Sequence, residues 1–393
     1  MITIEATEDA AVRRPARPGG TAMFRLALLA TALLLSAQAA TAGAPQVTGR
    51  AYLVQNGVSG EVLAHSHDQE RLPIASITKL MTVLVTLEHV RLDDLVTVSR
   101  RAAEVGESSI FLRKGERLTV RDLVDAALIQ SANDAAVVLA EYVGGSQYAF
   151  VAMMNAEAQK LGLKDTHFVN PDGLDAPGHY STARDVTRLA RIAMKNPVIR
   201  EVVGHDSATI AGGRTLSTWN DLLDTYPGVF GVKTGHTASA GWSEVAAARS
   251  NGVTIYATLL GAQTRDGRNA DLAALLTWGI TRYRTVHVIS SERVYATATA
   301  PYGRRQLLLV PGGQETRVVR VDRPLVERVV APSVVSLPVK EGQRLGEVRV
   351  YAGARLIASR PLVASRSIAK PGFLGRSQWY AGRTLHHIGA WFS

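Results

Sequence analysis

A serine and a lysine at short spacing could together carry out nucleophilic catalysis. Ser76 and Lys79 form a Ser-x-x-Lys group at the head of a segment with helical apolar spacing. Three residues on a helix bring both side chains to one face. A serine hydroxyl reacts only when a base takes its proton, and a desolvated lysine with a lowered pKa can be that base. The helix N-terminus would favour an oxyanion nearby. Alone, this group is expected about once by chance in an average chain.

A second polar group, Ser131-Ala-Asn133, interrupts the apolar stretch LIQSANDAA. The Ser131 hydroxyl can relay a proton to a leaving nitrogen, and the Asn133 side chain can hydrogen-bond a substrate amide. Taken alone, a polar break between two helices is the simpler interpretation.

A third group, Lys233-Thr234-Gly235, stands at the end of a predicted strand in GVFGVKTGHT. A strand edge can pair with an extended peptide, while Lys233 and Thr234 hold a carboxylate. Gly235 would leave space for substrate beside the backbone. Taken alone, an ordinary exit from strand to turn explains these residues at least as well.

Residues 45–283 show strand patterns at both ends and helical patterns in the centre. This arrangement predicts one α+β unit. We expect strands over 50–55, 228–235, 241–247 and 254–260, and helices over 76–89, 123–143, 150–161, 182–194 and 271–283.

The segments outside this unit have different patterns. Residues 286–366 are Val-rich with regularly placed Gly turns, which predicts a small all-β domain. Residues 373–393 place Trp and Phe opposite Arg on a helical wheel, with Trp379 as an exception on the polar side. This pattern is typical of a helix that lies in a membrane surface, although packing on its own domain is the alternative.

The N-terminal region has the pattern of an export signal. In 23–42, Arg25 precedes a short apolar run that ends in Ala-x-Ala patterns, as in a secretory signal peptide. Residues 1–22 then form an extension without a structural pattern, and we expect Met23 to be the real start.

Composition excludes several classes of function. The chain has no Cys, so thiolate metal sites, a Cys nucleophile and disulfides are excluded. Its net charge is +10, but the basic residues are dispersed and not interleaved with aromatics, which disfavours nucleic acid as a partner. The ten His show no HExxH-like spacing, so we expect neither a metal nor another cofactor.

The three groups occur in the order found in the penicillin-recognising serine enzymes. The stretches LPIASITKLMT, SSIFLRKGE, LIQSANDAA, GLDAPGHYSTARD and GVKTGHT resemble the D-Ala-D-Ala carboxypeptidases, which are low-molecular-mass penicillin-binding proteins of peptidase family S11. The resemblance covers about 47–283 closely. It implies a β-lactamase/transpeptidase-like catalytic domain, in which an antiparallel sheet carries a helical subdomain. A small all-β domain and a C-terminal amphipathic helix would follow it.

The resemblance also implies roles for individual residues. Ser76 would be acylated and Lys79 would be the base, with the backbone N–H groups of Ser76 and His236 as oxyanion hole. Arg268 would help hold the substrate's terminal carboxylate, with Arg265 as a competitor. The other residues expected in or beside the cleft are Ser108, Ser109, Ser131, Asn133, Lys233, Thr234 and Gly235.

The implied function is removal of the terminal D-alanine from peptidoglycan stem pentapeptides, with β-lactam antibiotics as acylating inhibitors. The implied location is the periplasmic face of the inner membrane, bound through 373–393. A D,D-endopeptidase of the same family and a non-catalytic penicillin-binding sensor stay open as alternatives. A class A β-lactamase is disfavoured, because it needs a deacylating Glu and none lies between Glu157 and Glu201.

Overall fold

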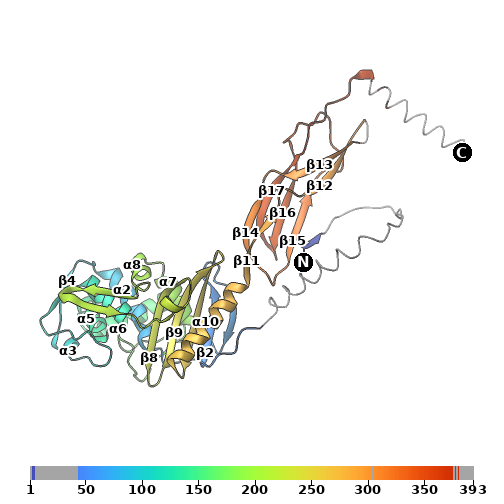
Figure 1. Ribbon diagram of the computed structural model, residues 1–393. Coiled ribbons are helices and arrows are strands. Elements are labelled where there is room, and N and C mark those ends of the chain that lie inside the picture. The colour runs from blue at the N-terminus through green and yellow to red at the C-terminus, as the bar shows by residue number, and fades with distance from the viewer. Residues whose placement is uncertain (1, 5–42, 303–304, 375–376, 378, 380–393) are drawn as a thin grey trace. The chain divides into compact units, whose positions relative to one another are not determined.

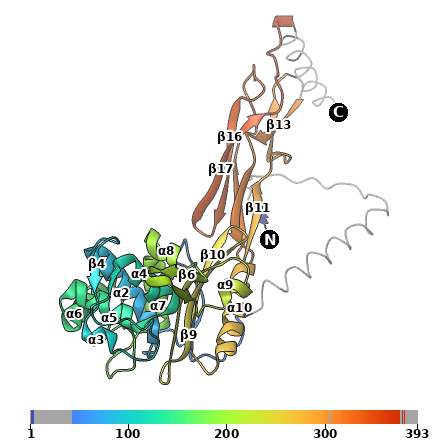
Figure 2. The same cartoon turned by 60° about the vertical axis from the view of Figure 1, so that its left-hand side comes forward.

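The computed structural model describes residues 2–4, 43–302, 305–374, 377 and 379. The described residues divide into two compact units, one from the range 42–281 and the other from the ranges 1–41 and 282–393. The predicted signal segment 23–42, nearly all of the extension 1–22 and most of 373–393 lie outside the described residues. Figure 1 labels the elements of both units, and Figure 2 turns the same drawing by 60°.

An antiparallel five-stranded sheet forms one layer of the 42–281 unit, in the order β3-β2-β10-β9-β8. Its strands are β2 (Ala51–Asn56), β3 (Val62–Ser66), β8 (Val229–Thr237), β9 (Gly241–Ser250) and β10 (Val253–Ala262). Strands β2 and β3 form a hairpin, and β8 forms one edge of the sheet. That edge is open to an additional strand.

Two helices cover opposite faces of this sheet. Ile255 of β10 contacts Gly279 of α10 (Arg265–Thr281) on one face. Thr258 of the same strand hydrogen-bonds Thr187 of α7 (Ala183–Ala193) at 2.6 Å on the other. Alternation of side chains along a strand explains why residues 255 and 258 face opposite helices. The sequence predicted α10 only from residue 271, because its first turn is polar and contains Gly267.

A helical subdomain forms the left-hand part of this unit in Figures 1 and 2, and the sheet with α10 forms the right-hand part. At its centre is α2 (Lys79–His89), whose first eight residues are all buried. Around it the same apolar core includes residues of α4 (Val120–Asp125), α5 (Asn133–Gly144) and α6 (Gln147–Lys160). This unit also contains the short helices α3 (Arg100–Ala103), α8 (Pro197–Val202) and α9 (Leu222–Thr225).

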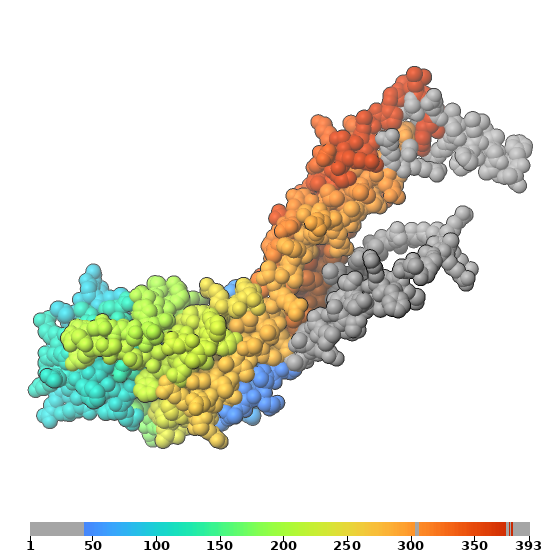
Figure 3. Space-filling view, viewed as in Figure 1, coloured from blue at the N-terminus to red at the C-terminus, as the bar shows by residue number. Residues whose placement is uncertain are grey.

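Two small two-stranded antiparallel sheets complete the unit. They are β4 (Leu95–Thr97) with β5 (Arg117–Thr119), and β6 (Ser207–Ile210) with β7 (Arg214–Ser217). The lime-coloured β6–β7 hairpin lies on the surface of the unit in Figure 3.

The described part of the second unit consists mainly of strands and contains the separate β domain expected after the catalytic unit. A six-stranded sheet has the order β1-β15-β16-β17-β13-β12, and β11 pairs separately with β14. The bounds are β1 (Ile2–Ile4), β11 (Tyr283–Ile289), β12 (Ala296–Ala300), β13 (Arg305–Pro311), β14 (Glu315–Arg320), β15 (Leu325–Val330), β16 (Arg344–Ala352) and β17 (Arg355–Ala364). Its own apolar core includes Leu307, Val348 and Leu362.

The start of the predicted C-terminal helix is described at four residues, Phe373, Leu374, Ser377 and Trp379, which have helical backbone. The ring of Trp379 meets that of Tyr302 edge to face, with centroids 5.3 Å apart. Among the described residues, no helix is both long and apolar enough to cross a membrane.

Candidate active site

Ser76 and Lys79 lie where a 3₁₀ turn, Ala75–Thr78, leads into α2. The sequence predicted one helix from residue 76, and the tighter first turn is the difference. Ala75 has a left-handed backbone with φ of 48°, a conformation that costs free energy for a residue with a side chain. The Lys79 ammonium nitrogen, Nζ, lies 2.8 Å from Ser76 Oγ. The spacing of three residues therefore brings the two functional groups into direct contact.

Lys79 is completely buried and held by two further acceptors. Its Nζ donates to Asn133 Oδ1 and to the carbonyl oxygen of Asp172, each at 2.7 Å. Burial lowers the pKa of Lys79 to about 8, against the opposing effect of the carboxylates of Asp172, Asp134 and Glu107. A substantial fraction of Lys79 is therefore neutral close to physiological pH.

The geometry around Lys79 Nζ determines where a neutral amine can accept a proton. Two of its three hydrogen-bonding directions face oxygens that can only accept, Asn133 Oδ1 and the Asp172 carbonyl. Only the third direction faces a group that can also donate, the Ser76 hydroxyl. When Lys79 is neutral, its lone pair must therefore point at Ser76 Oγ, as a general base requires.

The loop that supplies the Asp172 carbonyl contacts the nucleophile's turn at two points and α2 at a third. The chain at Gly173 runs so close to Ala75 that a Cβ at Gly173 would lie 2.0 Å from the Ala75 carbonyl oxygen. His179 Nε2 lies 2.8 Å from Thr78 Oγ1, and Thr82 Oγ1 donates to the Pro171 carbonyl at 2.5 Å. These contacts hold the loop against the turn.

His179 acts in this contact as a neutral imidazole. Burial lowers the pKa of His179 to about 4, and its Nδ1 accepts from the Val169 N–H at 3.2 Å. Its Nε2 must then carry the proton and donate to Thr78.

Ser131 and Asn133 lie at a break in the helices, as predicted. A short π-helical stretch, Ala126–Gln130, ends at Ser131, whose backbone is left-handed with φ of 63°, and Asn133 begins α5. Asn133 Nδ2 donates to the Gly106 carbonyl at 3.2 Å, which orients its oxygen toward Lys79. The strained turn aims the Ser131 hydroxyl at Lys233 Nζ, 2.9 Å away.

Lys233, Thr234 and Gly235 lie inside β8, not at its end as the sequence suggested. The strand runs on to Thr237 because His236 and Thr237 continue its pairing with β9. Lys233 is buried, and burial together with the positive charge of Lys79 lowers its pKa well below the usual value. The imidazole of His236 stacks on the indole of Trp242, with ring centroids 4.0 Å apart.

Gly235 lies directly against the backbone of the nucleophile's turn. A Cβ at this position would be 2.7 Å from the Ile74 carbonyl oxygen and 3.1 Å from Ser76 N. Real Cβ atoms do not approach backbone this closely, so only glycine fits here. The contact brings the edge of β8 next to the Ser76 amide.

A cleft of about 210 Å³ opens at this junction. It is lined by Ser76, Glu107, Ser108, Ser131, Trp219, Thr234, Gly235, His236, Trp242 and Arg268. Three further residues lie behind this lining. Lys79 contacts the lining residue Ser76 and also binds Asn133, and Lys233 contacts the lining residue Ser131. All nine residues predicted for the site are therefore brought together.

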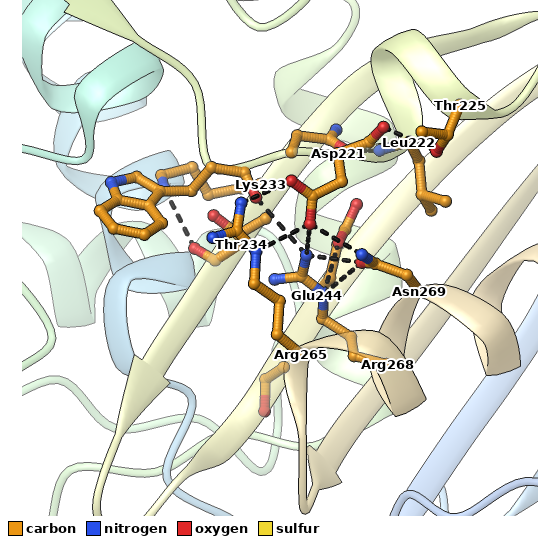
Figure 4. A network of polar contacts seen from close by, with 12 residues as sticks. Asp221, Leu222, Thr225, Lys233, Thr234, Glu244, Arg265, Arg268 and Asn269 are labelled. Atoms are coloured by element: carbon orange, nitrogen blue, oxygen red, sulfur yellow. Dashed lines mark hydrogen bonds and ion pairs between the residues drawn. The ribbon is translucent and has the colours of Figure 1, made fainter.

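Of the two candidate arginines, Arg268 lines the cleft. Its side chain is only 1% exposed and has close polar partners behind the cleft. Arg268 Nε lies 3.0 Å from Glu244 Oε2, and Arg268 Nη2 donates to Asn269 Oδ1 at 2.6 Å. Figure 4 shows these side chains converging behind Lys233 and Thr234. Arg265 instead forms a bidentate ion pair with Asp221. Its Nε donates to Asp221 Oδ2 at 2.8 Å and its Nη2 donates to Asp221 Oδ1 at 2.5 Å.

Several residues of the site were not identified from the sequence. Glu107, Trp219 and Trp242 line the cleft, and Glu244 lies behind Arg268. The available signal was a charged residue directly before an apolar run, since Glu244 precedes Val245 and three alanines in β9. Of the two serines predicted beside the site, Ser108 lines the cleft, whereas Ser109 Oγ donates to Asp134 at 2.6 Å.

Known proteins have similar sequences and a similar fold. The family model described as D-alanyl-D-alanine carboxypeptidase, Peptidase S11, matches residues 38–264. The D-alanyl-D-alanine carboxypeptidase DacC of Escherichia coli K12 is 34% identical over 376 residues, 90% of this chain and 92% of that protein. DacF of Bacillus subtilis is 31% identical, covering 80% of this chain and 85% of its own.

Solved structures agree with the sequence relatives. Penicillin-binding protein 6B from Escherichia coli has a TM-score of 0.62 at 31% identity, covering 82% of this chain and 97% of that one. Penicillin-binding protein 5 from Haemophilus influenzae has a TM-score of 0.62 at 28% identity, with 84% and 100% covered. The α+β fold expected from the sequence is confirmed, and the chain belongs to the D-alanyl-D-alanine carboxypeptidase family, peptidase S11.

Proposed function

We propose that this enzyme removes the terminal D-alanine from peptidoglycan stem peptides through an acyl-enzyme on Ser76. The observation that carries the proposal is the contact between Lys79 Nζ and Ser76 Oγ, in a site where only Ser76 can donate to a neutral lysine. The family supplies the substrate class, because its curated members are named for D-alanyl-D-alanine carboxypeptidase activity.

Acylation begins when Lys79 takes the proton of Ser76. The Oγ–C bond then forms at the carbonyl between the two terminal D-Ala residues. The negative charge that develops on the carbonyl oxygen is stabilised by backbone N–H groups, for which Ser76 and His236 are the candidates. The close approach of Gly235 to Ser76 N supports this assignment, because it brings β8 next to that amide.

Collapse of the tetrahedral intermediate breaks the C–N bond and releases D-alanine. The leaving nitrogen needs one proton, and Ser131 is the group positioned to deliver it. Its Oγ lines the cleft and accepts from Lys233 Nζ at 2.9 Å, so it can relay to the leaving nitrogen the proton that Lys79 took from Ser76, and direct delivery by Lys79 is the alternative route. Either route leaves Lys79 neutral again. Lys79 then takes a proton from the water that attacks the Ser76 ester and returns it to Ser76 Oγ, which gives the free serine and a shortened peptide.

Substrate binding uses the open edge of β8 and the cations around it. An extended peptide can add to this edge as a further strand, which places its carboxyl end near Thr234 and Arg268. A guanidinium and a hydroxyl together suit a terminal carboxylate. β-Lactams also present an acyl carbonyl and a carboxylate, so we propose that they acylate the same serine.

Release of D-alanine from a pentapeptide ending in D-Ala-D-Ala tests this function. Wild-type protein should release D-alanine, whereas the Ser76→Ala variant should not. A crosslinked peptide dimer as second substrate distinguishes the alternative of an endopeptidase, and rapid turnover of a β-lactam would point to a β-lactamase. Absence of release, or equal release by the variant, contradicts the proposal.

We propose in addition that the enzyme is exported by 23–42 and held at a membrane surface by 373–393. Trp and Phe opposite Arg in the C-terminal segment support this location. Trp379, the exception on the polar side of the helical wheel, meets the ring of Tyr302 edge to face. Deleting 380–393, which retains Trp379, should release the protein from membranes. Retention in the membrane pellet would contradict an anchor there.

A further inference from the structure

A completely buried carboxylate, Glu244, lies directly behind the arginine assigned to the substrate's terminal carboxylate. It belongs to β9 and pairs in register with Thr234 of β8 and Leu259 of β10. Its Oε2 is 3.0 Å from Arg268 Nε. Neither of its oxygens accepts a hydrogen bond from a described residue, and Arg268 Nε donates instead to Asn269 Oδ1 at 3.0 Å.

An ionised carboxylate in such a position costs free energy. A buried carboxylate normally accepts several hydrogen bonds, and a buried ion pair alone stabilises a fold less than apolar packing of the same volume. Stability therefore does not explain Glu244. Such a group calls for a specific explanation, and its contact with the cleft's arginine suggests one.

The charges that face Glu244 come from three elements, and Figure 4 shows them together. Arg268 and Arg265 belong to α10, Lys233 to β8, and Asp221 to the segment before α9. The paired residue on β10, Leu259, is apolar. Glu244 thus lies among three cationic side chains and one other carboxylate, and its charge offsets one of those cations.

Arg268 has one guanidinium nitrogen available for a ligand. Its Nε and Nη2 face Glu244, Asn269, Asp221 and the Trp219 carbonyl, whereas no hydrogen bond to a described residue uses Nη1. A substrate carboxylate that binds Arg268 would share this guanidinium with Glu244. Two carboxylates on one cation repel each other, and the buried one is then the easier to protonate.

We propose that Glu244 is a positioning residue that takes up a proton when the substrate's terminal carboxylate binds at Arg268. This inference rests on the proposed function, because it assumes that Arg268 receives that carboxylate. In the empty cleft, ionised Glu244 balances the positive charge of the Arg268 guanidinium. In the complex, a proton from solvent neutralises Glu244, and the substrate's carboxylate takes over its place in the charge balance.

The titration of Glu244 agrees with this role. Burial raises the pKa of Glu244 to about 7, and Asp221 adds to that effect, while Arg268, Lys233 and Arg265 oppose it. A carboxyl group that is half ionised near neutral pH can gain a proton at small cost. Binding and proton uptake are then linked, so the affinity for the carboxylate falls as pH rises through this range.

The test uses full-length protein with Ser76→Ala, which binds peptide without turnover. Calorimetry in two buffers of different ionisation enthalpy measures proton uptake when a peptide ending in D-Ala-D-Ala binds. The same peptide with a C-terminal amide is the matched ligand. We expect net uptake at pH 7.5 for the carboxylate peptide only. Its Kd should weaken about fivefold to tenfold from pH 6 to pH 8.

Adding Glu244→Gln, which keeps the shape and removes the titration, should abolish the proton uptake. Its Kd at pH 8 should equal the Kd of the Glu244 protein at pH 6. Glu157→Gln is the control, because Glu157 is a buried carboxylate on α6 that pairs with Lys160. It should leave the pH dependence unchanged. A purely structural Glu244 would weaken binding equally at every pH in the Gln variant.

Two outcomes overturn the inference, and both can be measured with the Ser76→Ala protein alone, without the Glu244→Gln variant. Equal proton uptake for the carboxylate and amide peptides contradicts it while leaving the proposed function intact. Equal affinity for the two peptides at every pH contradicts the assignment of Arg268 itself, and the inference fails with it.

Discussion

Lys79 Nζ lies 2.8 Å from Ser76 Oγ, and its two other hydrogen-bonding directions face oxygens that can only accept. The contact between Lys79 and Ser76 follows from their spacing of three residues along one turn. The two other acceptors around Lys79 Nζ come from α5 and from the loop at Asp172. A lysine placed this way is a base only in its neutral form. The rate of acylation should therefore follow the titration of Lys79.

The first prediction concerns pH. Burial lowers the pKa of Lys79 to about 8, so the neutral base becomes the major form above that pH. We expect kcat at saturating substrate to rise about tenfold per pH unit well below pH 8 and to level off above it. Saturating substrate is used because the proposed titration of Glu244 weakens substrate binding as pH rises, and kcat at saturation does not depend on that affinity. A kcat that is flat or falling between pH 6 and pH 8 would count against Lys79 as the base.

The second prediction concerns proton delivery by Ser131. Ser131→Ala should lower kcat about 10²-fold to 10⁴-fold with little change in KM, because general acid catalysis contributes that much. Ser108→Ala is the matched control, since the Ser108 hydroxyl also borders the cleft but donates to the Gln130 carbonyl. Steady-state kinetics of both variants decide the matter. Equal effects would show that Ser131 has no special part in proton transfer.

The third prediction separates the two arginines. Arg268→Gln should lower kcat/KM for a carboxylate substrate about 10-fold to 100-fold relative to its amide, because a charge-assisted hydrogen bond is lost. Arg265→Gln should leave that ratio near its wild-type value, because Arg265 is held by Asp221. The ratio of substrates cancels losses from misfolding. A larger change in the Arg265 variant would reverse the assignment.

Much of this arrangement was predictable because local patterns specify it. The polar break at Ser131 and the α+β division were read correctly, since helices and strands differ in apolar period. The end of β8 was misplaced, because Lys233 and Gly235 look like a turn although their pairing with β9 continues to Thr237. Glu244 was missed because its meaning comes from a contact with α10, which no local pattern encodes.

The fourth prediction concerns the junction of β8 with the nucleophile's turn. In Gly235→Ala, the new Cβ would lie 2.7 Å from the Ile74 carbonyl oxygen, so β8 must move away from Ser76. Overpacking of this kind costs about 1–3 kcal/mol of unfolding free energy, and we expect acylation to fall as well. Chemical denaturation and β-lactam labelling measure the two effects.

Gly43→Ala serves as the control for this junction, because no described atom beyond its chain neighbours lies within 4 Å of its Cβ position. It should match wild type in both assays. If Gly235→Ala also matched wild type, the close approach of β8 to Ser76 would have no functional weight.

The most direct test of the whole account is to identify the acylated residue. Wild-type protein is quenched during turnover of a D-Ala-D-Ala peptide, digested, and sequenced by tandem mass spectrometry. The account predicts an adduct on Ser76 with the mass of the substrate less D-alanine, and a matching ring-opened adduct after treatment with a β-lactam. An adduct on any other residue, or D-alanine release with Ser76 unmodified throughout, would contradict it.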